Sequence, residues 1–210
     1  MARIQFVKAR EILDSRGNPT LETSIALDDG SIGLASVPSG ASTGSHEAKE
    51  IRDNDINRYS GKGVLTAVRN INHRLGPSII GLDGSDQEEI DSVLCAQDGT
   101  PTKTILGANA ILGVSLGVAK ANAHSKGIPL YRSLKSDQPL VLPTPMLNII
   151  NGGRHANNSL DFQEFMVVPT GFSNFKEALR CAVEVYHALK LVLEKKNLST
   201  AVGDEGGFAP

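Results

Sequence analysis

Apolar and polar residues alternate along much of the first forty residues, which is the pattern of half-buried β-strands. Three such runs occur, around residues 4–6, 21–27 and 32–34. The segments 14–19 and 28–30 separate them with turn residues, in which glycine allows positive φ and proline ends a strand. The pattern predicts a three-stranded antiparallel meander with one apolar face. The loop that follows, rich in small residues, has no periodic apolar set and is predicted to be a mobile surface loop.

From about residue 60 to 126 the apolar spacing becomes helical. One predicted face is formed by residues three or four apart: Val64, Val68, Ile71 and Leu75. A second helix containing Ile90 and Leu94 is predicted to start after Asp86, a typical N-cap residue. This region therefore predicts helices that cover the sheet.

A third helix, over about 104–124, carries glycines although each one costs about 1 kcal/mol relative to alanine in a helix interior. The spacing of Gly113 and Gly117 also occurs in transmembrane helices. Asn109 and Lys120 interrupt the apolar stretch, however, so we expect no membrane span. The pattern favours a central, buried helix that other helices cross closely.

Composition changes near Pro129, and the polar stretch 136–139 predicts a boundary between domains at 1–138 and 139–210. Beyond it the pattern predicts two buried strands, one long helix and a short strand: 146–150, 165–168, 175–193 and 198–202. Asn174 and Glu177 have the spacing of a capping box before the helix. Such a sequence of elements closes no obvious core. We therefore expect either a small irregular domain or a piece of something longer.

The composition narrows the class of protein. Among 210 residues, Lys and Arg number 21 and Asp and Glu 23, a formal net charge of −2. This balance argues against nucleic acid or anionic lipid as the main partner. Cys95 and Cys181 are too few for a disulfide scaffold, and the N-terminus lacks a secretory signal pattern. We expect a protein of a reducing compartment.

Four segments combine polar or ionisable side chains with glycine. They contain, in order, Ser39 with Ser42 and Thr43, then His155, then Gln163 with Glu164, and finally Asp204 with Glu205. Taken alone, the serine-containing loop is better explained as a linker, since it lacks the lysine of a phosphate-binding P-loop. A structural role for His155 and a surface role for Glu164 also stay open. The last segment is different, because two carboxylates among glycines are more typical of a site.

The sequence resembles the enolases, the phosphopyruvate hydratases of glycolysis, over its whole length. Six stretches carry the resemblance: 11–19 (EILDSRGNP), 37–44 (VPSGASTG), 106–115 (LGANAILGVS), 148–157 (NIINGGRHAN), 161–166 (DFQEFM) and 203–210 (GDEGGFAP). The resemblance implies an α+β N-terminal domain with a three-stranded meander, followed by the start of an atypical ββαα β/α barrel. It also implies a cytoplasmic homo-oligomer, most simply a dimer.

The resemblance further implies the reversible dehydration of 2-phosphoglycerate to phosphoenolpyruvate with Mg²⁺. Ser39 matches a serine on a closing loop that helps to hold the second magnesium ion. His155 matches a histidine near the phosphate, and Gln163 matches a residue that contacts the site. Glu164 and Glu205 match a carboxylate pair that acts on the leaving hydroxyl group. Two neighbouring carboxyl groups can hold one shared proton, and a departing hydroxide needs such a proton donor.

Enolase-superfamily sites also need a base and divalent cations to stabilise the charge formed on proton abstraction. The family's base lysine and the three acidic ligands of the first magnesium ion have no counterpart in these 210 residues, and a complete barrel needs about 250 residues by itself. We therefore expect the chain alone to be inactive. The alternative is a non-catalytic polypeptide that binds or complements an enolase.

Overall fold

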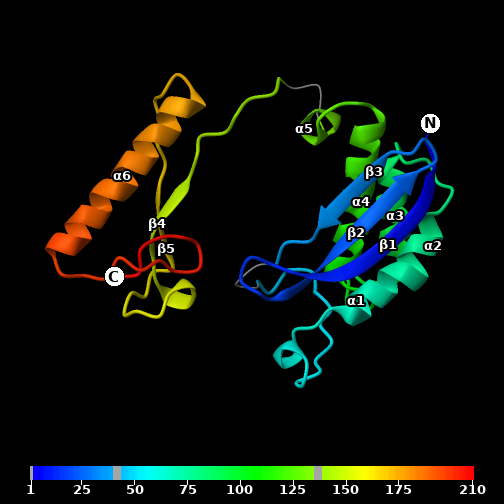
Figure 1. Ribbon diagram of the computed structural model, residues 1–210, viewed down its shortest axis with the longest axis horizontal. Coiled ribbons are helices and arrows are strands. Elements are labelled where there is room, and N and C mark those ends of the chain that lie inside the picture. Colours follow the sequence, from blue (N-terminus) through cyan, green and yellow to red (C-terminus); the bar gives the residue numbers. More distant parts are fainter. Residues whose placement is uncertain (1, 40–43, 135–138) are drawn as a thin grey trace. The chain divides into compact units, whose positions relative to one another are not determined.

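The computed structural model describes residues 2–39, 44–134 and 139–210. The chain divides into two compact units, Met1–Asp137 and Gln138–Pro210 (Figure 1). Ser42 and Thr43, with the centre of the predicted mobile loop, lie outside the described residues, as does most of the predicted boundary segment 136–139. The two units are described separately below.

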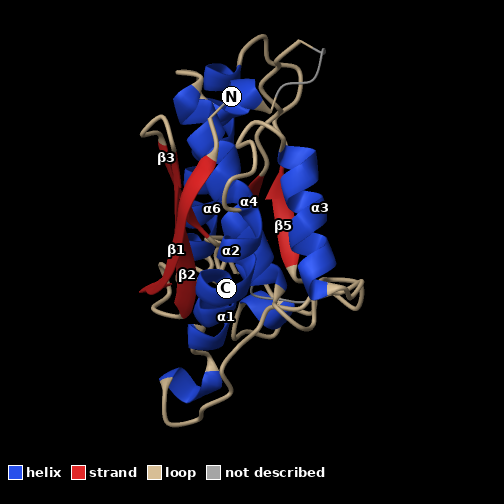
Figure 2. Cartoon of the chain, turned by 90° about the vertical axis from the view of Figure 1, so that its right-hand side faces the viewer, coloured by secondary structure: helices blue, strands red, loops and turns tan. Residues whose placement is uncertain are grey.

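The described residues of the first unit form an antiparallel sheet in the order β1-β2-β3. Its strands are β1 (Ile4–Leu13), β2 (Pro19–Leu27) and β3 (Ile32–Ser36). The helical segments that follow are η1 (Tyr59–Gly61), α1 (Leu65–Asn70), η2 (Ile71–Leu75), α2 (Gly76–Ile79), α3 (Gln87–Asp98), α4 (Ala108–Ser125) and α5 (Leu130–Ser133). The predicted meander is thus confirmed. Figure 2 shows the helices of this unit gathered on one side of the sheet.

The core of the first unit lies between the sheet and these helices. Alternate residues of β2, including Leu21, Ile25 and Leu27, are buried together with Ile90 and Val114 from the helices. The Asp86 side chain accepts a hydrogen bond from the Glu89 amide at 2.9 Å, which confirms the predicted N-cap of α3.

Helix α4 begins at Ala108, four residues later than predicted. The carboxylate of Asp98 accepts hydrogen bonds from the amides of Ile105 and Leu106, and Gly107 has a φ of 97°. These contacts hold residues 105–107 in a turn, so the first helical turn starts only after it. The prediction missed this because a distant carboxylate, and not local propensity, decides the conformation.

The sheet, and not a crossing helix, is the close neighbour of the α4 glycines. A Cβ atom on Gly113 would lie 2.8 Å from Leu21 Cδ1, and one on Gly117 would lie 2.6 Å from Ile25 Cγ1. The expectation that other helices cross α4 closely at these glycines is therefore wrong, because the close neighbour is the sheet. Small residues are needed here because β2 and β3 run directly across the helix.

The free edge of β1 is occupied by a side chain. Asn72, in the π-helical turn η2, accepts a hydrogen bond from the Ala9 amide at 2.8 Å and donates one to the Ala9 carbonyl at 3.2 Å. The Asn72 amide thus replaces a neighbouring strand at this position. Such a device protects an edge strand from pairing with another chain.

Asp98 fastens the loop between α3 and α4, and its substitution by asparagine is expected to destabilise the first unit. The side chain is 3% exposed. Burial raises the pKa of its carboxyl group, but hydrogen bonds from Leu106, Thr100 and Ile105 outweigh this effect and hold the pKa below the ordinary aspartate range. A lowered pKa stabilises the fold above about pH 4, and this stabilisation is lost as the pH falls through the folded value.

We expect Asp98→Asn to lower the free energy of unfolding by about 1–3 kcal/mol at pH 7. The difference between wild type and variant should shrink in urea titrations at pH 3 and below, because wild-type Asp98 becomes protonated there. A difference that stays the same at both pH values would contradict this role of the carboxylate.

The described residues of the second unit form a two-stranded antiparallel sheet and a long helix. The elements are β4 (Leu147–Asn151), η3 (Gly153–His155), β5 (Glu164–Val167) and α6 (Phe175–Lys195). The predicted helix is confirmed, and its Asn174 side chain accepts a hydrogen bond from the Glu177 amide at 3.0 Å.

Two expectations for this unit are wrong. The strands are not fully buried: residues 147–150 of β4 are half-buried, and Phe165 and Met166 of β5 are 44% and 45% exposed. The segment 198–202 is not a strand; only Val202 forms an isolated antiparallel bridge, to Phe208. An apolar run needs a neighbouring strand before it can extend into a ladder.

None of the helices in the described parts of the chain has the length and hydropathy needed to cross a bilayer.

Candidate active site

Three of the predicted site residues lie at the ends of elements in the β4–β5 hairpin. His155 ends η3, directly after β4, while Gln163 precedes β5 and Glu164 begins it. The hairpin register pairs Asn151 with Glu164, and the Gly152 amide donates to the Gln163 carbonyl at 3.1 Å. Backbone pairing therefore brings His155, Gln163 and Glu164 to the same end of the hairpin.

Glu205 reaches the same place on the turn 203–207. The Asp204 amide donates to the His155 carbonyl at 2.9 Å, and the Gly207 amide donates to the buried Asn151 Oδ1 at 2.8 Å. A Cβ atom on Gly203 would lie 2.5 Å from the His155 carbonyl oxygen, so only glycine fits there without a shift. The turn is thus fastened directly to the hairpin.

Helix α6 also contacts the turn 203–207, through Tyr186. The Tyr186 hydroxyl donates to the Gly206 carbonyl at 2.9 Å, and its ring stacks on Phe208 with centroids 4.3 Å apart. An open depression of about 370 Å³, lined by Asn148, Tyr186 and Glu205 among others, lies beside the turn. A small polar ligand could approach Glu205 through it.

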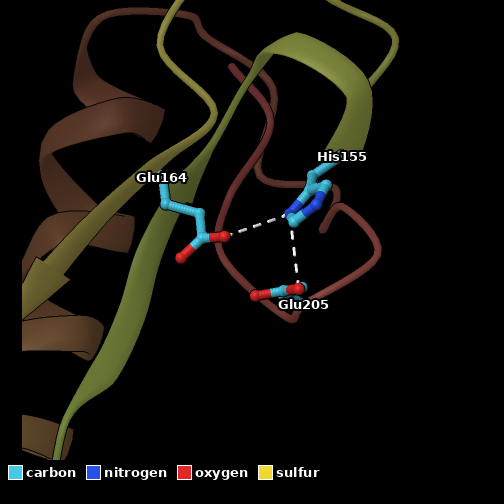
Figure 3. A group of neighbouring side chains, drawn as sticks. All are labelled: His155, Glu164 and Glu205. Carbon is cyan, nitrogen blue, oxygen red and sulfur yellow. Dashed lines mark ion pairs between the residues drawn. The ribbon is translucent and has the colours of Figure 1, made fainter. Parts of the chain in front are cut away.

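The two carboxylates converge on one ring nitrogen of His155 (Figure 3). His155 Nδ1 lies 3.5 Å from Glu164 Oε1 and 3.4 Å from Glu205 Oε1. The His155 side chain is 3% exposed, whereas the side chains of Glu164 and Glu205 are 26% and 40% exposed. Segments about 50 residues apart in sequence therefore form a single group with one buried base and two partly accessible acids.

The other ring nitrogen of His155 faces Gln163. His155 Nε2 lies 2.7 Å from Gln163 Nε2. As placed, the amide donates to the ring, and rotation of the amide by half a turn would instead let its oxygen accept a proton from Nε2. The orientation of the Gln163 amide is therefore coupled to which ring nitrogen carries the proton.

Ser39 belongs to the first unit, and its hydroxyl group is engaged there. Ser39 Oγ donates to Glu50 Oε2 at 3.2 Å and accepts from Arg52 Nη2 at 3.1 Å. Arg52 also donates to the carbonyls of Pro19 and Lys62 at 2.6 and 3.0 Å. The guanidinium group therefore ties the start of the loop to β2 and to the segment before α1.

The sequence patterns did not identify the residues that bring His155, Glu164 and Glu205 together. Asn151, a fully buried polar residue in strand β4, accepts the hydrogen bond from the Gly207 amide that joins the turn to the hairpin. A buried asparagine costs free energy unless it forms hydrogen bonds. A polar residue within the apolar run of β4 was therefore the one sequence feature that indicated such a contact. Apart from their charge, nothing in the sequence indicated that Glu50 and Arg52 form hydrogen bonds with Ser39 Oγ.

Comparison with family models covers both units. Residues 4–134 match the N-terminal domain of enolase, and residues 139–210 match the C-terminal TIM barrel domain of enolase. The chain belongs to the enolase family. Its first unit is the α+β enolase N-terminal domain with its three-stranded sheet, and β4, β5 and α6 are elements of the enolase barrel domain. Family membership makes this the sequence of an enolase-like lyase.

Proposed function

We propose that this chain supplies the acid–base part of a site that interconverts 2-phosphoglycerate and phosphoenolpyruvate, a step of glycolysis. The observation that carries the proposal is the convergence of Glu164 and Glu205 on His155 Nδ1 at 3.5 and 3.4 Å, within a chain of the enolase family. In the forward direction the proton at C2 is removed, the C3–O bond breaks, and the hydroxyl group leaves as water.

Glu164 and Glu205 are proposed to act on that leaving group. Hydroxide leaves only slowly from carbon, so a carboxylic acid must donate a proton as the C–O bond breaks. Glu205, on its partly exposed turn, can approach the substrate through the neighbouring depression. Glu164 Oε1 lies 3.5 Å from the same ring nitrogen, His155 Nδ1, and Glu164 forms the second member of the pair.

Gln163 and His155 are proposed to contact the substrate. Both lie at the same end of the hairpin as Glu164, and the His155 ring is held by its contact with Gln163. His155 can interact with an anionic phosphate oxygen when its ring is protonated, and Gln163 can offer either end of its amide. These roles follow from the match of each residue to the enolase motifs.

Mg²⁺ is part of the proposal through the family. A magnesium ion would supply positive charge to stabilise the doubly charged carboxylate formed when the C2 proton leaves. Ser39 is the residue matched to a magnesium ligand, but its hydroxyl group lies 3.1 Å from the Arg52 guanidinium, a cation that repels a second cation. The described arrangement of Ser39 therefore does not fit a magnesium ion, and Ser39 would have to leave Arg52 to bind one.

We propose that the 210-residue chain alone does not catalyse the reaction. The lysines of the second unit, Lys176, Lys190, Lys195 and Lys196, all lie exposed on or next to α6, and none matches the family's base lysine. Without that base and the matching acidic ligands, removal of the weakly acidic C2 proton has no assistance.

Mixing the chain with 2-phosphoglycerate and Mg²⁺ and following phosphoenolpyruvate absorbance tests this. We expect no turnover by the chain alone, and turnover after addition of a polypeptide that carries the remaining barrel segment of an enolase. Clear turnover by the chain alone would contradict the assignment of the base and the first magnesium site outside these residues.

The alternative function, a non-catalytic partner of another enolase polypeptide, has its own support. Val141, Leu142 and Phe162 of the second unit are 83%, 71% and 73% exposed. Exposed apolar side chains of this size favour association. Binding to the complementing polypeptide without restored turnover would favour this function over catalysis.

We also propose that the protein is a cytoplasmic homodimer associating through its N-terminal unit. On the first sheet Phe6 of β1 and Ile32 and Leu34 of β3, the two strands that flank β2, are 50–52% exposed, as expected of an apolar contact surface.

A further inference from the structure

We propose that His155, Glu164 and Glu205 bind a first-row transition-metal dication such as Zn²⁺, with water completing a tetrahedral site. Among the described residues these three side chains offer ligand atoms that all lie within 4.8 Å of one another. The proposal concerns metal binding by this chain alone and does not depend on its proposed part in the lyase reaction.

A buried nitrogen without a hydrogen-bond partner points at this position. His155 is 97% buried, and its Nδ1 atom makes no hydrogen bond with any described residue. Leaving such an atom unpaired costs free energy, so native structures usually provide a partner, a water molecule or an ion. Figure 3 shows Nδ1 directed at the carboxylates of Glu164 and Glu205.

The distances fit a tetrahedral ion better than an octahedral one. Zinc bonds of about 2.0–2.1 Å place two tetrahedral ligand atoms ~3.3–3.4 Å apart. Magnesium bonds of similar length in an octahedron place neighbouring ligands ~2.8–3.0 Å apart. The observed separations of Nδ1 from the two Oε1 atoms are 3.5 and 3.4 Å, close to the tetrahedral edge. The two carboxylate ligand atoms lie within 4.8 Å of each other, so rotation of the partly exposed Glu205 side chain would complete the site.

The ligand types favour the same class of metal. An imidazole nitrogen suits zinc, copper, nickel and cobalt, whereas magnesium prefers oxygen ligands. Two carboxylates balance the charge of a divalent ion. Glu205 is 40% exposed on its turn, so its side chain can adjust to complete the site and a water ligand can enter.

Gln163 supplies the outer contact that a metal-binding histidine needs. Such a histidine usually donates its second N–H to an acceptor, which orients the ring and leaves the first nitrogen free to bind. The Gln163 amide, 2.7 Å from His155 Nε2, can present its oxygen there after rotation by half a turn. The Nδ1 lone pair then faces the two carboxylates.

Titration of the full chain with Co²⁺ alone, followed by displacement with Zn²⁺, tests the proposal. We expect one equivalent of Co²⁺ to give the strong visible absorption of tetrahedral cobalt, which Zn²⁺ abolishes. Glu205→Gln, on an exposed turn that should fold normally, and His155→Asn should each weaken binding at least tenfold. His187→Asn, which removes an exposed histidine of α6, should bind like the wild type.

Absence of tetrahedral cobalt absorption, or binding that Glu205→Gln leaves unchanged, would overturn the proposal. Gln163→Glu gives an independent readout, because a carboxylate accepts the Nε2 proton more strongly than an amide does. We expect this variant to bind Zn²⁺ about tenfold more tightly than the wild type. Unchanged or weaker binding by Gln163→Glu would contradict Nδ1 as the ligand atom.

Discussion

Replacing Gly33 with alanine is expected to lower the free energy of unfolding of the N-terminal unit by about 3 kcal/mol or more. A Cβ atom at this position of β3 would lie 2.1 Å from the Gly117 carbonyl oxygen and 2.4 Å from the Ala121 amide nitrogen. Both neighbours are backbone atoms of α4, so no side chain can move aside. The strand and helix would have to separate, which would open the core between them.

Urea denaturation followed by circular dichroism measures this effect. Gly44→Ala is a matched control, because the nearest atom to its added Cβ is Glu47 Oε1 at 3.6 Å, an ordinary contact with a flexible side chain. We expect the control to stay within about 0.5 kcal/mol of the wild type. A Gly33→Ala protein as stable as this control would show that β3 and α4 are not packed backbone to backbone.

Replacing Glu205 with glutamine is expected to reduce phosphoenolpyruvate formation about 10²–10⁴-fold in the complemented enzyme, the range typical of a lost general acid. Glutamine keeps the size of the side chain but cannot deliver a proton. Glu164→Gln should fall in the same range, because the proposed mechanism uses the two carboxylates as a pair. The effect should appear in kcat, measured at saturating 2-phosphoglycerate.

Asp204→Asn is the matched control for this prediction. Asp204 is the adjacent carboxylate on the same turn, but its described role is a backbone hydrogen bond to His155, which asparagine retains. We expect less than a threefold change for Asp204→Asn. Equal losses for Asp204→Asn and Glu205→Gln would indicate that the charge of the turn matters and not a particular proton donor.

Local signals predicted much of the N-terminal unit and the long helix of the second unit. Period-two alternation and turn residues gave the meander, and the N-caps Asp86 and Asn174 marked the starts of α3 and α6. These features depend on side chains and backbone within a few residues of each other. For that reason they can be recognised without knowledge of the tertiary structure.

Features that depend on distant partners could not be predicted in this way. The glycines of α4 indicated close packing but not that the sheet was the neighbour. Apolar composition predicted a buried strand around Phe165 and Met166, although these residues are 44% and 45% exposed. The segment 198–202 forms no strand, only the single bridge from Val202 to Phe208.

The candidate site shows the same division. Residue types and motif resemblance identified His155, Gln163, Glu164 and Glu205, but not that two carboxylates meet one buried imidazole nitrogen. That geometry depends on the hydrogen bond from Gly207 to Asn151 and on the one from Asp204 to His155. Both join the turn 203–207 to the hairpin across about 50 residues of sequence.

The most direct test of the proposed role of Glu205 separates the two halves of the reaction. In the complemented Glu205→Gln enzyme, exchange of the C2 proton of 2-phosphoglycerate with deuterated solvent can be followed by NMR beside phosphoenolpyruvate formation. The proposed mechanism predicts that exchange continues within about tenfold of the wild-type rate while dehydration is lost, because Glu205 acts on the leaving hydroxyl group and not on the C2 proton. Loss of exchange and dehydration to the same extent would contradict that role.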